Sequence, residues 1–481
     1  MFRTLAAVGT ALTLGAVAAL SWPQPVKPNE LQSDLGALYD GLKSAHIAFY
    51  ANRTEAEYDA LFKRTIARLN KPLSKYDAYL EFQKFAAFGN VAHASVNPPS
   101  DLFSQFRANG GKTFPIYLRI HDGITYVGED YSGSDEIMPG DQILSLNGID
   151  MATWLERTGV YVSADTPYIE HSLLEFRFPS YLWNELGGVD TFDLEIETIA
   201  GEQKSVTIDA LNRAAQKLNG LGQSNGFMID SNSRESRLLE NGMAYLRPGP
   251  FYNFQNPSRS WDNSGFISFI DDAFEDFMAA GADTLIIDLR ENPGGDNSFS
   301  DHMVAWIADK PFLFASEFLV RSSDEAEAAN QARLDGNPDA AAGVSGLFAE
   351  KYKSTPRGEV FSFKLPESQP REGEQFEGDV YVLINRHSYS QAVNVAATFQ
   401  DYGWGTIAGE PTSDFATTYG STESFRLPNT GLTVIFPKAH IIRPSGDRVP
   451  GGVVPEVLID SPIVPEAEDV VLSELIAHIR K

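Results

Sequence analysis

The segment Val382-Leu383-Ile384-Asn385-Arg386-His387-Ser388-Tyr389-Ser390-Gln391-Ala392 passes from apolar residues through a polar turn to the start of a helix. The apolar residues belong to a predicted buried strand at Asp379–Ile384, and a helix is predicted at Gln391–Tyr402. A short strand at Gly405–Ala408 follows. A strand, a crossover helix and a further strand are typical of a parallel α/β sheet.

A second predicted strand, Thr284–Leu289, ends in the turn Arg290-Glu291-Asn292-Pro293-Gly294-Gly295. A strand at Met243–Arg247 and a helix at Phe266–Ala280 precede it, so the α/β alternation extends from about 238 to 465. Glycines in such a turn can present backbone N–H groups to a negatively charged ligand atom, although they can equally form a tight turn with no other role. The charged, Ala-rich residues 322–346 indicate a surface helix or an insertion.

Ser390 lies where the strand at Asp379–Ile384 gives way to a helix, which makes it a candidate nucleophile. Ligands of open α/β sheets bind at the carboxyl ends of the strands, and N–H groups point outward from a helix start. The alternative is that Ser390 or Ser388 only caps the helix, which is the commoner role of serine at this position.

The composition limits the chemistry that the chain can perform. Its 481 residues, 43% of them apolar, are enough for several domains with hydrophobic cores. Cysteine is absent, which excludes disulfides, thiolate metal sites and a cysteine nucleophile. The net charge of -27 argues against nucleic acid or an anionic membrane surface as a partner.

Residues 1–23 have the pattern of a secretory signal peptide or an N-terminal anchor. A basic start precedes an apolar stretch from Leu5 to Trp22, and Ala16, Ala18 and Ala19 offer a cleavage site. The apolar stretch is also just long enough to span a bilayer uncleaved. We therefore expect an extracytoplasmic protein, periplasmic or secreted.

Two further regions precede the α/β core. Residues 28–96 show helical periodicity, with a capping-box pair at Thr54 and Glu57, and predict a helical N-terminal region. Residues 112–210 are predicted to be rich in strands. Within them, Ile137-Met138-Pro139-Gly140-Asp141-Gln142-Ile143-Leu144-Ser145-Leu146-Asn147-Gly148 resembles part of a PDZ domain, whose sheet edge can bind an extended peptide. An ordinary hairpin with an Asn-Gly turn is the alternative.

The motifs "LIIDLRENPGGDN" and "VYVLINRHSYSQAVNVAATFQDYGWGTIAGEPT" together resemble the S41 family of serine peptidases, the tail-specific or C-terminal processing proteases. The resemblance covers nearly the whole chain after residue 23. It implies a mixed α/β fold with a helical N-terminal region, a PDZ-like module and a protease core. It also implies a serine endopeptidase that acts on peptide or protein substrates and needs no cofactor or metal.

Site residues follow from this resemblance. The family nucleophile matches Ser390, in the context Ser390-Gln391-Ala392. The oxyanion hole of the family implies backbone N–H groups from Gly294 or Gly295 together with Gln391. Asp288 and Arg290 are interpreted as a structural charge pair below the turn.

The general base departs from the best-known branch of the family. That branch uses a Lys about 25 residues after the serine, but no Lys lies between Lys364 and Lys438 here. Other branches use a His from the end of the helical region, and Gly89-Asn90-Val91-Ala92-His93-Ala94 occupies that place. We therefore expect His93 to be the base; the alternative is a helix-capping His. His387, His440 and His302 are weaker candidates.

The carboxylate that orients the base is not determined by the motifs. Where the His-dependent branch has a Glu, before the terminal Gly-Val-x-Pro segment, this chain has Val449. Glu410 is a substitute, with a role in loop structure as its alternative. An incomplete set of catalytic residues leaves open a pseudo-protease that binds peptides without cleaving them. An esterase is less favoured, since Ser390 lacks the Gly-x-Ser-x-Gly context.

Overall fold

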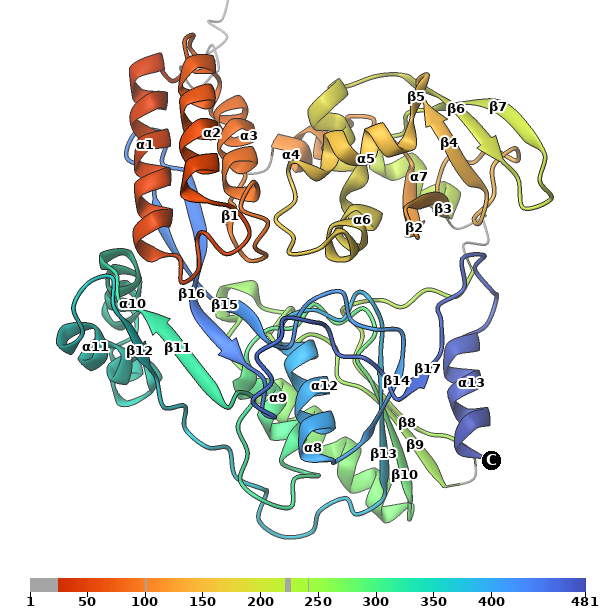
Figure 1. The fold of residues 1–481 in the computed structure, drawn as a ribbon. Coiled ribbons are helices and arrows are strands. Elements are labelled where there is room, and N and C mark those ends of the chain that lie inside the picture. Colours follow the sequence, from red (N-terminus) through yellow and green to blue (C-terminus); the bar gives the residue numbers. More distant parts are fainter. Residues whose placement is uncertain (1–24, 100–101, 221–225, 241) are drawn as a thin grey trace, which may run out of the picture.

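The structure is a computed structural model that describes residues 25–99, 102–220, 226–240 and 242–481. Three regions are visible in Figure 1: a helical bundle at upper left, a sheet with helices at upper right, and a larger α/β core below. The predicted signal segment, residues 1–23, lies outside the described residues. No helix in the described ranges is long and apolar enough to cross a membrane.

The N-terminal bundle contains α1 (Pro28–Ala45), α2 (Glu55–Arg68) and α3 (Lys75–Ala87). The start of α2 is fixed locally, because Thr54 accepts the backbone N–H of Glu57 while the Glu57 carboxylate accepts the N–H of Thr54, at 3.3 and 2.8 Å. The strand after the bundle, β1 (Ser95–Val96), pairs with β16 (Thr433–Ile442) from near the end of the chain. The N-terminal region is therefore tied directly to the core.

A five-stranded sheet makes this connection, in the order β1-β16-β11-β12 with β15 on the other side of β16. Its remaining strands are β11 (Glu317–Arg321), β12 (Val360–Ser362) and β15 (Thr418–Arg426). The segment predicted as a surface helix or insertion contains α10 (Asp324–Gly336), η2 (Pro338–Ala342) and α11 (Val344–Ser354). Apolar side chains of these elements and of α1–α3 form one hydrophobic core.

The middle module has a sheet in the order β2-β3-β4-β6-β7, with β5 paired to β4. Its strands are β2 (Ile116–His121), β3 (Ile124–Asp130), β4 (Gln142–Leu146), β5 (Ile149–Asp150), β6 (Thr191–Glu197) and β7 (Gln203–Asp209). Its helices are α4 (Leu102–Ala108), α5 (Met151–Gly159), α6 (Pro167–Leu186) and α7 (Arg213–Gly220). The β-rich prediction does not include α5 and α6. The start of α6 is nevertheless typical, with Thr166 as N-cap and Pro167 as first residue.

The core sheet has the order β17-β14-β13-β10-β9-β8 and is parallel except for β8. Its strands are β8 (Glu235–Leu238), β9 (Met243–Arg247), β10 (Thr284–Asp288), β13 (Asp379–Ile384), β14 (Thr406–Gly409) and β17 (Val457–Leu458). Its helices are η1 (Pro257–Arg259), α8 (Ser264–Ala279), α9 (Asn297–Val304), α12 (Gln391–Tyr402) and α13 (Val470–Ile479). This architecture confirms the mixed α/β fold class.

The side chains of β10 alternate between the two faces of the core sheet, and both faces are covered by helices. Leu285 and Ile287 pack with the helices α8, α9 and α12, whereas Ile286 between them packs with α13. Strands β10 and β13 pair in parallel, with Asp288 opposite Leu383. The turns that follow these two strands therefore lie side by side at the carboxyl edge of the sheet.

Candidate active site

Ser390 occupies the turn between β13 and α12 in a left-handed backbone conformation, with φ 51° and ψ -118°. It stands at the N-cap position of α12, yet its hydroxyl makes no capping hydrogen bond to the described helix. The hydroxyl of Ser388 has a structural role instead, since it donates to the Leu289 carbonyl at 2.8 Å. Positive φ at a non-glycine residue costs roughly 1–3 kcal/mol, and such strain is concentrated at functional sites.

Asp414 stabilises this strained backbone. Its Oδ2 accepts the backbone N–H of Ser390 at 2.6 Å, and its Oδ1 accepts the N–H of Phe415 at 2.9 Å. The Asp414 side chain is buried, so the hydrogen bond to Ser390 is shielded from water. The conformation of the Ser390 turn is thus fixed by a residue that the sequence reasoning did not single out.

The glycine turn after β10 packs directly against Ser390. A Cβ added to Gly294 would lie 2.9 Å from the Ser390 Cβ and 2.5 Å from the Tyr389 carbonyl oxygen, so only glycine fits. The N–H of Gly294 donates to Asn292 Oδ1 at 2.9 Å and is committed within the turn. Of the two predicted oxyanion donors in this turn, Gly295 is the one that lines the cavity beside Ser390.

His93 lines the same cavity, of about 410 Å³, together with Ser390, Gly295 and Gln391. The fold therefore brings together residues that lie far apart in the sequence. His93 also has a left-handed backbone, with φ 66°. Its Nδ1 is buried and has no hydrogen-bond partner among the residues that the structure describes.

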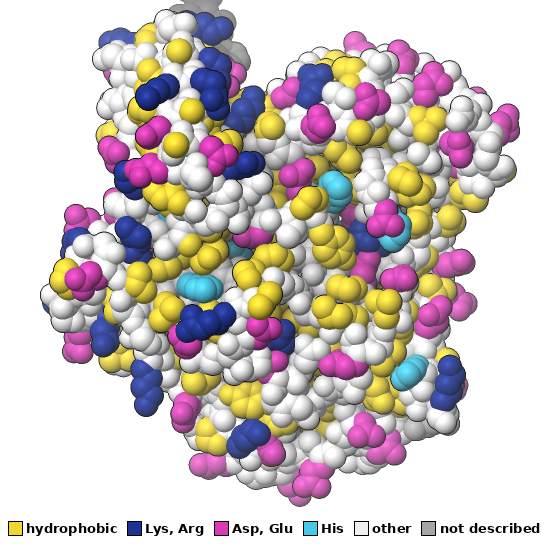
Figure 2. All heavy atoms as spheres, viewed as in Figure 1, with side chains coloured by type: hydrophobic (Ala, Val, Ile, Leu, Met, Phe, Trp, Pro, Cys, Tyr) yellow, Lys and Arg dark blue, Asp and Glu magenta, His cyan; other side chains and the backbone are white. Residues whose placement is uncertain are grey.

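The remaining wall of the cavity, apart from His93 and the Ser390 turn, is largely apolar. Its side chains come from the segment before β11, from β11, from α11, from the loop after β12 and from β16, and they are Phe314, Phe318, Val344, Phe348, Leu365, Pro366 and Ile441. Apart from His93, Asp296 is the one ionisable side chain among the described residues that line it. Figure 2 shows hydrophobic side chains gathered along the seam between the upper modules and the core on this face.

Glu410 lies outside this cavity. Its carboxylate accepts a hydrogen bond from Arg386 Nε at 2.9 Å and forms an ion pair with Arg119 at 3.5 Å. Although burial raises the pKa of a carboxyl, the hydrogen bond from Arg386 and the charge of Arg119 hold the pKa of Glu410 below its usual range. The structure thus brings Glu410 to two arginines and not to His93, which corresponds to its alternative role in loop structure.

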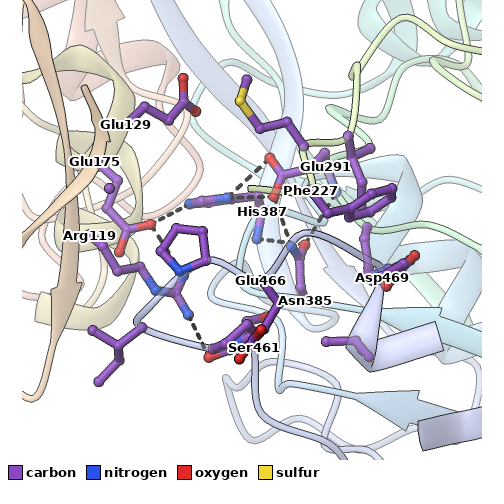
Figure 3. A pocket seen from close by; sticks show the side chains of 18 of the residues that line it. Arg119, Glu129, Glu175, Phe227, Glu291, Asn385, His387, Ser461, Glu466 and Asp469 are labelled. Carbon is purple, nitrogen blue, oxygen red and sulfur yellow. Dashed lines mark hydrogen bonds and ion pairs between the residues drawn. The ribbon is translucent and has the colours of Figure 1, made fainter. Parts of the chain in front are cut away.

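His387 lies in a second cavity, between the middle module and the core. Figure 3 shows its imidazole between Glu175 and Glu291; the nitrogen–oxygen distances are 2.8 Å to Glu175 and 2.9 Å to Glu291. Burial by itself lowers the pKa of an imidazole, but the charges of Glu291 and Glu175 raise the pKa of His387 to about 10. His387 therefore carries a proton at neutral pH, and it lines this second cavity and not the Ser390 cavity.

The remaining ionisable candidates have structural partners. His302 contacts Asp271 at 2.6 Å, and the ring of His440 lies 4.8 Å from that of Tyr419. Arg290 pairs with Asp288 at 2.7 Å, as interpreted from the sequence.

A serine hydroxyl at a strand-to-helix turn, beside backbone amides of a glycine turn, is the arrangement of a serine hydrolase. Residues 259–459, which include both turns, match the sequence model of peptidase family S41. This part of the chain therefore belongs to peptidase family S41, as its motifs predict. No curated protein sequence matches the chain.

Solved structures of CPAF are similar to this chain over most of its length. Mature CPAF complexed with lactacystin has a TM-score of 0.65 and 16% sequence identity, covering 94% of this chain and 98% of that chain. Mature CPAF alone has a TM-score of 0.62 and 17% identity, covering 94% and 96%. At this level of identity the likeness establishes a shared fold.

Proposed function

We propose that the chain is a serine endopeptidase in which Ser390 is the nucleophile and His93 the general base. The observation that carries this proposal is the cavity lined by both residues together with Gly295 and Gln391. His93 comes from the end of the helical region and Ser390 from the core, so their convergence depends on the packing of two regions against each other.

The reaction would proceed by acyl transfer. Ser390 Oγ forms a bond to the peptide carbonyl carbon while its proton passes to His93. The carbonyl oxygen becomes negatively charged and accepts hydrogen bonds from the N–H groups of Gly295 and Gln391. The C–N bond then breaks, His93 returns the proton to the leaving amine, and water hydrolyses the acyl-enzyme by the same steps in reverse.

The charge state of the neighbouring histidine favours His93 as the base. A general base must accept a proton, and His387 already holds one, since Glu291 and Glu175 raise its pKa to about 10. His387 also lines the other cavity. The geometry supports the raised pKa of His387, because both of its ring nitrogens face carboxylates.

We further infer that the middle module is PDZ-like and that residues 1–23 direct the chain out of the cytoplasm. In the middle module β2 is one of the two edge strands, β7 being the other, and an extended peptide would pair with such an edge. At Ile120 the backbone of β2 is already hydrogen-bonded to other residues. The Ile120 N–H donates to Glu175 at 2.7 Å, and the Ile120 carbonyl oxygen accepts from Arg386 at 2.6 Å. Cell fractionation with sequencing of the mature N-terminus tests the compartment; a cytoplasmic, uncleaved chain would contradict it.

Labelling with a fluorophosphonate probe tests the nucleophile and the base, because phosphonylation requires an activated serine. We expect wild-type protein to be labelled at Ser390 and Ser390→Ala to remain unlabelled. His93→Ala should label at least 100-fold more slowly. Ser421→Ala, which removes another serine lining the same cavity, and His440→Ala should label at nearly the wild-type rate.

Three outcomes would contradict this proposal. Absence of any labelling would favour the pseudo-protease, a protein that retains peptides in the cavity without cutting them. Normal labelling of His93→Ala would show that another group activates Ser390. Labelling accompanied by hydrolysis of esters but of no peptide or protein would favour the esterase alternative.

A further inference from the structure

Asp165 lies in the loop between α5 and α6 of the middle module, immediately before the N-cap residue of α6. Its Oδ2 accepts the backbone N–H of Ala92 at 3.0 Å. Because Ala92 directly precedes His93, this hydrogen bond places the carboxylate against the turn that carries the proposed base. The middle module thereby supplies an acidic side chain to the turn that carries His93, a residue that lines the Ser390 cavity.

The electrostatic surroundings of Asp165 point to the same neighbours. Burial raises the pKa of Asp165 to about 6; the Ala92 N–H lowers it, the charge of Asp414 raises it and His93 lowers it. The charges of His93 and of Asp414, the residue that holds the Ser390 backbone, are therefore close enough to affect the pKa of Asp165. Burial raises the pKa of the Tyr419 hydroxyl, and the charge of Asp165 raises it further.

The other carboxylates near the site have partners of their own. Both oxygens of Asp414 accept backbone N–H groups, and Glu410 is bonded to Arg386 and Arg119. Asp296, which lines the cavity, is the N-cap of α9, and its Oδ1 accepts the backbone N–H of Ser298 at 2.9 Å. His93 Nδ1, by contrast, is buried without a hydrogen-bond partner among the described residues. Leaving a buried polar atom without a hydrogen-bond partner costs free energy. A His93 ring that carries its proton on Nδ1 therefore needs an acceptor there.

We propose that Asp165 is the positioning residue of the active site, accepting Nδ1–H of His93 and directing its Nε2 toward Ser390. The inference rests on the proposed function and supplies the carboxylate that this chain lacks at Val449, where the His-dependent branch has a Glu. In this arrangement Asp165 stays ionised and gains no proton: the Ser390 proton moves to Nε2 and on to the leaving amine. Catalytic hydrogen bonds of this kind often tighten only when substrate is bound.

The test is the rate of fluorophosphonate labelling of the full chain carrying Asp165→Asn. We expect labelling to slow by about 100-fold or more, because an amide cannot stabilise the imidazolium that forms during attack. The matched control is Asp141→Asn, a buried carboxylate of the same module that accepts the backbone N–H groups of Met138 and Ile199 at 3.0 and 3.1 Å. This control should label at the wild-type rate.

Thermal unfolding at pH 8 separates a positioning role from a structural one. The folded pKa of Asp165 lies above the ordinary 3.8, so its stabilising contribution is present at low pH and is lost as the pH rises through about 6. Above that pH its charge disfavours the folded state, and Asp165→Asn should leave the Tm unchanged or raise it. Slow labelling with an undiminished Tm supports the inference.

Other outcomes overturn it. Labelling of Asp165→Asn within about threefold of wild type, while Ser390→Ala and His93→Ala fail to label, would exclude Asp165 and leave the proposed function intact. Slow labelling with a lowered Tm, matched by the same loss in Asp141→Asn, would mean that Asp165 only maintains the fold. Failure of the wild-type chain to label at Ser390 would overturn the proposed function and this inference together.

Discussion

At the scale of single residues, the site depends on a serine held in an unfavourable backbone conformation. The strain at Ser390 is tolerated because Asp414 accepts its N–H at 2.6 Å, and because Gly294 leaves room for its Cβ. A hydroxyl fixed in this way needs no reorganisation before attack, which is how a rigid site contributes to catalysis.

Removing the Asp414 carboxylate should therefore impair Ser390 directly. A hydrogen bond to a charged group contributes about 1.5–3 kcal/mol, so we expect Asp414→Ala to slow fluorophosphonate labelling by about 10- to 100-fold. Asp414→Asn retains a side-chain oxygen that can accept the same N–H and should recover part of the rate. Equal labelling of Asp414→Ala and wild type would show that the backbone conformation does not depend on this bond.

The site residues that motifs predict lie within continuous segments of sequence. Those that motifs miss act on residues far away in the sequence. Ser390, Gln391 and the pair Gly294 and Gly295 belong to continuous segments, so local residue order makes them candidates. Asp414 and Asp165 lie in segments with no motif, and they matter only through contacts made after folding. Glu410 was a reasonable candidate by position, but Arg386 and Arg119, which bind it, cannot be recognised from spacing.

At the scale of elements, the cavity is a product of two sheets. The core sheet supplies Gly295 and Ser390 through the turns after β10 and β13, whereas β11, α11 and β16 supply an apolar wall. The crossover pattern of strands and helices predicts the core sheet reliably, because each of its strands and helices has its own periodicity. The wall is not predictable in this way, since its elements meet only in the folded chain.

This wall should favour substrates with an apolar side chain next to the cleaved bond, and a charge placed in it should change that preference. Val344 is the first residue of α11 and is 41% exposed, and an Asp at a helix N-terminus is well tolerated. Val344→Asp should lower the Leu-to-Lys ratio of kcat/KM several-fold for paired peptides that differ only at that position.

The matched control for the wall is Val360→Asp. Val360 is an apolar residue on β12 that is 51% exposed and does not line the cavity. This variant should keep the wild-type ratio. An unchanged Leu-to-Lys ratio in Val344→Asp would mean that substrate side chains do not enter this part of the cavity.

At the scale of the whole molecule, buried charges connect the middle module to the core. His387 of the core lies between Glu175 of α6 and Glu291 of the turn after β10, and Arg386 also bonds to Glu175 at 3.0 Å. The same module contributes Asp165 to the His93 turn. The position of the middle module relative to the core therefore affects both these buried charge pairs and the proposed active site.

The raised pKa of His387 predicts how stability depends on pH. The folded protein keeps the His387 proton up to about pH 10, whereas the unfolded chain releases it near 6.5. The stabilisation is therefore complete below pH 6.5 and is lost as the pH rises toward 10. The free energy of unfolding in urea, measured from pH 6 to pH 10, should fall more steeply for wild type than for His387→Gln. Parallel curves would contradict a protonated His387.

The sequence by itself determined the α/β core and the two turns, and it made Ser390, Gln391 and either Gly294 or Gly295 candidate site residues, because each depends on periodicity or on continuous motifs. It also selected His93 as the candidate base and the S41 family as the relative. Only the tertiary structure decided that His93 lines the Ser390 cavity, that Glu410 belongs to a buried arginine network, and that Asp165 faces the His93 turn. The physical reason is that charge pairing and burial depend on distances across modules, which residue order does not encode locally.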